Sequence, residues 1–126
     1  MKLDKIVDMV PRLALIGACA CALVIAFLSL LPGDDLPSQN LNDKLNHFIA
    51  YGVLMGLAVL GRGARSLLWT GLLVAGYGLL LEGLQGVMPF GRSASLLDAI
   101  ANTGGVLIGT LAGLCAQAVI RRLARR

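Results

Sequence analysis

The chain carries, at residues 43–51, the stretch Asp43-Lys44-Leu45-Asn46-His47-Phe48-Ile49-Ala50-Tyr51, which opens an apolar run that continues to Gly61. Asp43, His47 and Tyr51 recur at every fourth position, so on a helix they share one face. Burying ionisable groups in hydrocarbon is costly, and intramembrane charges usually mark a functional site. The stretch therefore predicts a membrane helix whose polar face, including the chain's single histidine, takes part in function.

Composition places the chain among integral membrane proteins. Of its 126 residues, 57% are hydrophobic and 14% are charged, whereas a soluble domain is about half apolar and about a quarter charged. Apolar runs of about 17–22 residues can cross a hydrocarbon core of ~30 Å as helices. Four such runs occur, at residues 13–31, 45–61, 66–87 and 99–120. We expect an all-α integral membrane four-helix bundle that forms one domain over residues 1–126.

The basic residues predict the orientation of this bundle. Of the 11 Lys and Arg residues, all but Lys44 and Arg92 lie before the first run, between the second and third, or after the fourth. With four crossings these segments share one side of the membrane, and positively charged segments stay in the cytoplasm. Both termini are therefore predicted to be cytoplasmic. The same distribution argues against a nucleic-acid partner, because such a protein gathers its cations on one face.

Three of the predicted helices bring polar residues to a similar depth. Measured along the helix axis from the nearest arginine on the predicted cytoplasmic side, His47 lies at ~22 Å, Glu82 at ~25 Å and Asn102 at ~28 Å. All three are therefore expected in the outer leaflet, with Lys44 and Arg92 just above them at the interface. The sequence predicts a polar site that opens to the outside.

The segment from Glu82 to Asn102 has a local pattern that fits such a site. Glu82 and Gln85 are three apart and share a helix face, and Asp98 and Asn102 are four apart and share another. Arg92 falls in the connecting loop, from which it could fold back on Glu82 or Asp98. We therefore expect the third and fourth helices to contribute one face each.

The sequence also contains candidate capping residues at the start of the last helix. Ser93 or Ser95 can cap it, because serine accepts hydrogen bonds from the free N–H groups of the first turn. Ser95-Leu96-Leu97-Asp98 has the spacing of a capping-box variant. The chain is therefore predicted to enter its last helix at this point.

Small residues are spaced for close helix packing. Gly105, Gly109 and Gly113 recur every four residues in the last run, as do Gly52 and Gly56 in the second. Such faces let helix backbones approach closely in lipid. Two uses are open: contacts between helices of one bundle, or a homodimer through the face formed by Gly105, Gly109 and Gly113.

Three ordered motifs between about Asp43 and Gly109 carry a resemblance to a known family. They are Asp43-Lys44-x-x-His47-Phe48-x-x-Tyr51, then Glu82-x-x-Gln85, then Gly91-Arg92-Ser93-Ala94-Ser95-x-x-Asp98-x-x-x-Asn102-x-x-Gly105. With these motifs the chain resembles the VanZ-like membrane proteins. The resemblance implies a bacterial membrane protein, and the member that names the family is linked to resistance to the glycopeptide antibiotic teicoplanin. It implies no established reaction.

The leading hypothesis is a binding module. Arg92 and Lys44 could hold an anionic group, because arginine offers a planar fork suited to phosphate or carboxylate. Asn102, Gln85 and Tyr51 could add neutral hydrogen bonds, while apolar walls accept an acyl or polyprenyl chain. The expected partner is a membrane lipid or a lipid-linked envelope precursor. The candidate ligand-binding residues are Asp43, Lys44, His47, Tyr51, Glu82, Gln85, Arg92, Ser93, Ser95, Asp98 and Asn102.

Two other readings compete with binding. In an enzyme, His47 with Glu82 or Asp98 could form an acid–base pair acting on a lipid phosphate, although neither candidate serine is marked as a nucleophile. In a purely structural protein, His47, Glu82 and Asn102 would satisfy one another across helices. Transport is disfavoured, because the cytoplasmic halves of all four runs lack a series of polar residues along which an ion could cross.

No cofactor and no metal site are predicted. The three cysteines lie inside apolar runs at spacings that match no metal motif, and they are interpreted as small apolar fillers. A metal version of the enzyme would use His47 with Asp43, Glu82 and Asp98. One histidine with carboxylates lacks the spacing that identifies zinc sites.

Overall fold

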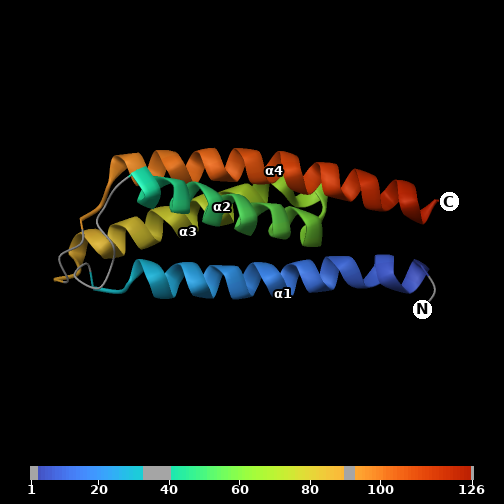
Figure 1. Cartoon of the computed structure of the whole chain (residues 1–126), viewed down its shortest axis with the longest axis horizontal. Coiled ribbons are helices and arrows are strands. Elements are labelled where there is room, and N and C mark those ends of the chain that lie inside the picture. The colour runs from blue at the N-terminus through green and yellow to red at the C-terminus, as the bar shows by residue number, and fades with distance from the viewer. Residues whose placement is uncertain (1–2, 33–40, 90–92, 126) are drawn as a thin grey trace.

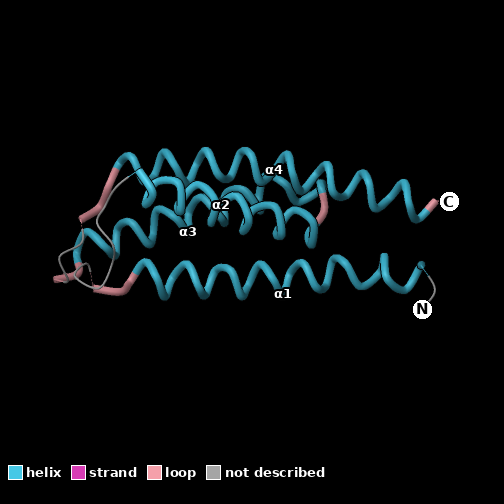
Figure 2. The backbone as a smooth tube through the Cα atoms, in the orientation of Figure 1, coloured by secondary structure: helices cyan, strands magenta, loops and turns pink. Residues whose placement is uncertain are grey.

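The computed structural model describes residues 3–32, 41–89 and 93–125. The described residues form four long helices and one short 3-10 helix, with no strand among them (Figures 1 and 2). In chain order these are α1 (Leu3–Ser29), α2 (Leu41–Arg62), η2 (Ala64–Ser66), α3 (Leu67–Val87) and α4 (Leu96–Ala124). The predicted all-α four-helix bundle is confirmed.

All four long helices are suited to crossing a membrane. Each contains a stretch of sufficient length and hydropathy: Val7–Ser29, Asn42–Arg62, Ala64–Val87 (which begins in η2) and Leu96–Ala124. Their large apolar side chains point outward, as in Leu23 at 72% exposure and Leu107 at 63%. A helix surface of this kind is stable against lipid tails and not against water.

The helices extend beyond the apolar runs from which they were predicted. α1 begins at Leu3 and carries the charged residues Lys5, Asp8 and Arg12 in its first turns. An apolar run marks the part of a helix that fits the hydrocarbon, whereas the hydrogen-bonded backbone can continue through the head-group region and into water.

The ends of the chain lie at one end of the bundle. Figure 1 shows the start of α1 and the end of α4 together, on the opposite side from the first turns of α2 and α4. The tight turn between α2 and α3 lies at the end of the bundle with the termini, and in it Gly63 has a φ of 85°, a left-handed conformation that favours glycine. That this end faces the cytoplasm remains a prediction from the basic residues.

α2 is the central helix and packs against α1, α3 and α4. Its side chains Tyr51, Met55 and Val59 are at most 2% exposed, and Thr70 of α3 is buried at 1%. α2 therefore contacts every other long helix, and its first turns carry the polar face.

α2 and α4 pack backbone to backbone. Both helices start at the same end of the bundle and run parallel (Figure 1). A Cβ atom on Gly105 would overlap the carbonyl oxygen of Phe48, and one on Gly109 would overlap that of Gly52. The glycine face of α4 is therefore occupied by α2 within the chain, the first of the two predicted uses. This contact sets the register of the two helices and so determines which polar residues meet.

Polar side chains also connect the helices, through hydrogen bonds to backbone carbonyls. Tyr77 of α3 donates its hydroxyl to Ala22 O of α1, and Gln117 of α4 donates its Nε2 amide to Val59 O of α2 at 2.6 Å. Hydrogen bonds of this kind between membrane helices contribute ~0.6 kcal/mol each on average. They orient the helices more than they stabilise the bundle.

Candidate functional site

The first turns of α2 and α4 face each other and bring five polar side chains together. Lys44 Nζ lies 3.1 Å from Asp98 Oδ1, an ion pair between the two helices. One turn deeper, His47 Nδ1 lies 3.0 Å from Asn102 Oδ1. Asp43 shares the face of His47, one turn toward the start of α2. The parallel register of α2 and α4 explains why both cross-helix pairs form at once.

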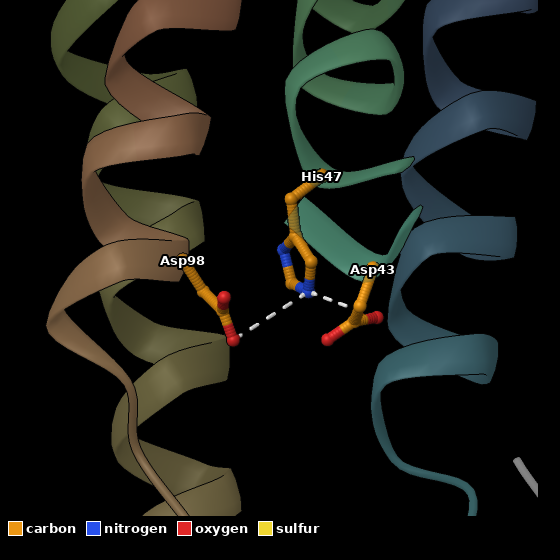
Figure 3. Close-up of side chains that lie close together, drawn as sticks. All are labelled: Asp43, His47 and Asp98. Atoms are coloured by element: carbon orange, nitrogen blue, oxygen red, sulfur yellow. Dashed lines mark ion pairs between the residues drawn. The ribbon is translucent and has the colours of Figure 1, made fainter. Parts of the chain in front are cut away.

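His47 is directed between two carboxylates. Its Nε2 atom lies 4.0 Å from Asp43 Oδ1 and 4.0 Å from Asp98 Oδ2 (Figure 3). Both distances exceed those of a direct hydrogen bond, which joins heavy atoms at about 2.7–3.2 Å. We refer to Asp43, His47 and Asp98 as the Asp–His–Asp cluster.

Exposure decreases from the rim of the site to its floor. The side chain of Lys44 is 32% exposed and that of Asp43 25%, whereas those of His47 and Asp98 are 12% and 11% exposed. Asn102, at the floor, is buried. A ligand would reach Lys44 and Asp43 first, and the ring of His47 after them.

The carboxylate of Asp98 is available because Glu82 takes over part of its capping role. Ser95 caps α4, as one of the two serines was predicted to do, and its Oγ accepts the Asp98 N–H at 3.3 Å. In a full capping box the acidic residue would return to the Ser95 N–H. Here that N–H donates to Glu82 Oε2 at 3.0 Å. Asp98 therefore keeps both oxygens for Lys44 and His47.

The other predicted residues that the structure describes make no ion pair or side-chain hydrogen bond with the Asp–His–Asp cluster, apart from Ser95, which caps α4 at Asp98. Glu82 and Gln85 of α3 are buried, and each forms a hydrogen bond with a backbone atom. Glu82 accepts the Ser95 N–H, and the Nε2 amide of Gln85 donates to Ser29 O at 2.9 Å. Tyr51 is buried below His47 on the same helix face. Ser93 is exposed. Arg92 lies outside the described residues.

A pocket of about 160 Å³ opens beside His47, between α1 and α2. Its walls are mostly apolar, and its polar groups come from both helices. The residues that line it are Ile25, Leu28, Ser29, Asp43, Asn46, His47, Ala50 and Tyr51. The sequence did not indicate the contribution of α1, whose apolar run carries no periodic polar signal. Asn46, a polar residue directly before His47, was a signal that could have been used.

The cluster offers two kinds of chemistry. A histidine beside a carboxylate can exchange protons with a bound group. Alternatively, the three side chains can act as ligands of a metal ion, since one donor atom from each lies within 4.8 Å of the other two. Glu82, which the sequence suggested as an acid–base or metal partner of His47, has no contact with this cluster among the interactions of the described residues.

The site lies within a recognised family region. The model of the family described as VanZ/LLP1 matches residues 20–117, which include residues 20–29 of α1 as well as the motifs of α2, α3 and α4. Comparison with curated proteins and with solved structures found no match.

Proposed function

The chain belongs to the VanZ/LLP1 family, and from this membership and the geometry of the site we propose that it binds the polar head of an envelope lipid. A lipid-linked cell-wall precursor, which combines a polyprenyl chain with a charged head, is the variant of this ligand that fits the family's link to glycopeptide resistance. The ligand would bind where α2 and α4 begin.

The pocket between α1 and α2 carries this proposal. The apolar walls of the pocket include Ile25, Leu28 and Ala50, and Asp43 and His47 line the same cavity. A cavity with an apolar interior and a few convergent polar groups is suited to an amphiphile, whose chain and head require different surroundings. Its volume of about 160 Å³ accommodates part of a chain and not a whole lipid, so the rest of the ligand would lie along the outside of the bundle.

Lys44 supports an anionic head group. An ammonium group has three donors, and Lys44 uses one of them for Asp98 Oδ1. At 32% exposure its side chain remains accessible to a phosphate or carboxylate. Arg92, from its position in the sequence, is proposed as the second cation.

The orientation predicted from the basic residues adds a reason for this ligand class. With cytoplasmic termini, the first turns of α2 and α4 face the outside of the inner membrane. A membrane site that opens to the outside suits a lipid-linked envelope precursor.

The test is lipid retention after gentle extraction, read by native mass spectrometry. Lys44→Ala and Arg92→Ala are expected to lose the bound lipid while remaining inserted and helical. Arg65→Ala is the matched control, because Arg65 is exposed at the opposite end of the bundle. Unchanged retention in both site variants would contradict the proposal.

A second candidate function is acid–base catalysis on a lipid phosphate. It is favoured by one observation, the 4.0 Å approach of Asp98 Oδ2 to His47 Nε2, while Asn102 holds the other ring nitrogen. Turnover of radiolabelled polyprenyl phosphates by the purified protein, lost in His47→Ala, is the expected result for an enzyme. Absence of turnover across a broad panel would leave binding as the function.

A further inference from the structure

We propose that the Asp–His–Asp cluster binds a divalent transition-metal ion through Asp43, His47 and Asp98. This inference does not require the proposed lipid, since all three donors come from the chain. It departs from the sequence prediction of no metal site, because the donors come from two helices and form no local motif. Their arrangement became visible only once the register of α2 and α4 was known.

The spacing of the donors fits a common ion. Nitrogen and carboxylate oxygen bind Zn²⁺ at about 2.0–2.2 Å, so in a tetrahedral site two ligand atoms are about 3.3–3.6 Å apart. His47 Nε2 lies 4.0 Å from an oxygen of each aspartate, and all three donor atoms lie within 4.8 Å of one another. The donor atoms are therefore wider apart than on a bound ion by about 1.5 Å at most, and side-chain rotations that bring them together would complete the coordination.

The orientation of His47 is that of a metal ligand. Its Nδ1 lies 3.0 Å from the side-chain oxygen of Asn102, and a carbonyl oxygen can only accept, so the ring proton belongs on Nδ1. In that tautomer Nε2 carries the lone pair. Metal-binding histidines commonly donate their second nitrogen to a carbonyl or carboxylate in this way. The lone pair then points between Asp43 and Asp98 (Figure 3).

The charges at the site call for a cation. Two carboxylates face the ring, and of the cations in the described part of the chain only Lys44 forms an ion pair with the cluster, through Asp98. Among the described residues, the charged groups at this site are thus two carboxylates and one ammonium group, in a region where charges are poorly solvated and a further cation is favoured.

The donor set indicates the class of ion. Imidazole suits zinc and other first-row transition metals, while carboxylates also suit manganese. Three protein ligands leave coordination positions open, as in catalytic rather than structural zinc sites. Because Asp43 and His47 also line the pocket between α1 and α2, an open position would face a molecule bound there. The ion would then present positive charge to an anionic head.

The experiment measures metal binding by the full-length protein in detergent, stripped of lipid and metal. Calorimetric titration with Zn²⁺ is expected to give one ion per chain, and Mn²⁺ bound at the site should show nitrogen coupling from imidazole in electron spin-echo spectra. His47→Ala and Asp43→Asn should each weaken Zn²⁺ binding by about 100-fold or more, and Asn102→Ala by about 10–100-fold, the usual loss when a histidine's orienting partner is removed.

The control is Asp8→Asn, which removes an exposed carboxylate at the other end of the bundle and should bind as the wild type does. Asp43 lies on the exposed rim in the first turn of α2, so Asp43→Asn keeps the proposal testable if His47→Ala does not fold. Wild-type protein that binds no ion, or site variants that bind like Asp8→Asn, would overturn the inference. Lipid retention measured after chelation reports separately on the proposed function.

Discussion

Glu82 of α3 accepts the backbone N–H of Ser95, the residue that caps α4, at 3.0 Å. This contact takes the hydrogen bond that Asp98 would otherwise make in a capping box. The acidic side chain of α4 is thereby left to Lys44 and His47. A buried residue on one helix thus controls the availability of a carboxylate on the next.

Glu82→Ala is expected to disturb both the cap and the site. It leaves the Ser95 N–H without its acceptor, a loss of about 1–3 kcal/mol for a buried donor, unless Asp98 turns back to replace it. Thermal unfolding in detergent measures the stability. Glu82→Gln retains a side-chain oxygen that can accept the same N–H, and should stay close to the wild type. Equal unfolding temperatures for Glu82→Ala and the wild type would exclude a role for this contact.

Gly109→Ala is expected to force α2 and α4 apart, because the new Cβ would overlap the backbone oxygen of Gly52. Backbone atoms cannot move aside as a flexible side chain can, so we expect a destabilisation of about 1–3 kcal/mol, measured by thermal unfolding followed by circular dichroism. The matched control is Gly83→Ala on α3, where a Cβ would meet nothing within 4 Å. That control should gain up to ~1 kcal/mol from helix propensity. Equal effects of the two substitutions would contradict the close packing.

Ala50→Leu is expected to fill the pocket between α1 and α2. Ala50 is one of its walls, and the larger side chain would occupy the space proposed for the ligand's chain. We expect lipid retention to fall about tenfold, or ~1.4 kcal/mol, with the helical content unchanged. Native mass spectrometry measures lipid retention in this variant and in the control Ala118→Leu, a substitution at an exposed position of α4. Full retention in Ala50→Leu would place the ligand elsewhere.

The orientation of the chain can be tested by labelling single cysteines in a variant without the three native ones. Ser93→Cys, at an exposed position shortly before the start of α4, should react with a membrane-impermeant maleimide added to intact spheroplasts. Ala64→Cys, exposed in η2 at the opposite end, should react only after lysis. The reverse pattern would invert the topology inferred from the positive-inside rule and move the site to the cytoplasmic face.

Features that depend on short separations along the chain were predictable. Four apolar runs indicated four membrane helices, because length and hydropathy alone determine what can cross a bilayer. The shared face of Asp43 and His47 follows from the helix period, and the cap at Ser95 follows from the spacing of serine and aspartate. Each of these features involves residues within a few positions of one another.

The partners of these residues were decided by the tertiary structure. The sequence allowed His47 to meet Glu82 or Asp98, but α4 presents Asp98 and Asn102 to it, and Glu82 is bonded to Ser95. The contribution of α1 to the pocket also had no local signal. Helix period determines which residues share a face, whereas the rotation and register of packed helices determine which faces meet. Here the close contact of Gly105 and Gly109 with the backbone of α2 sets that register.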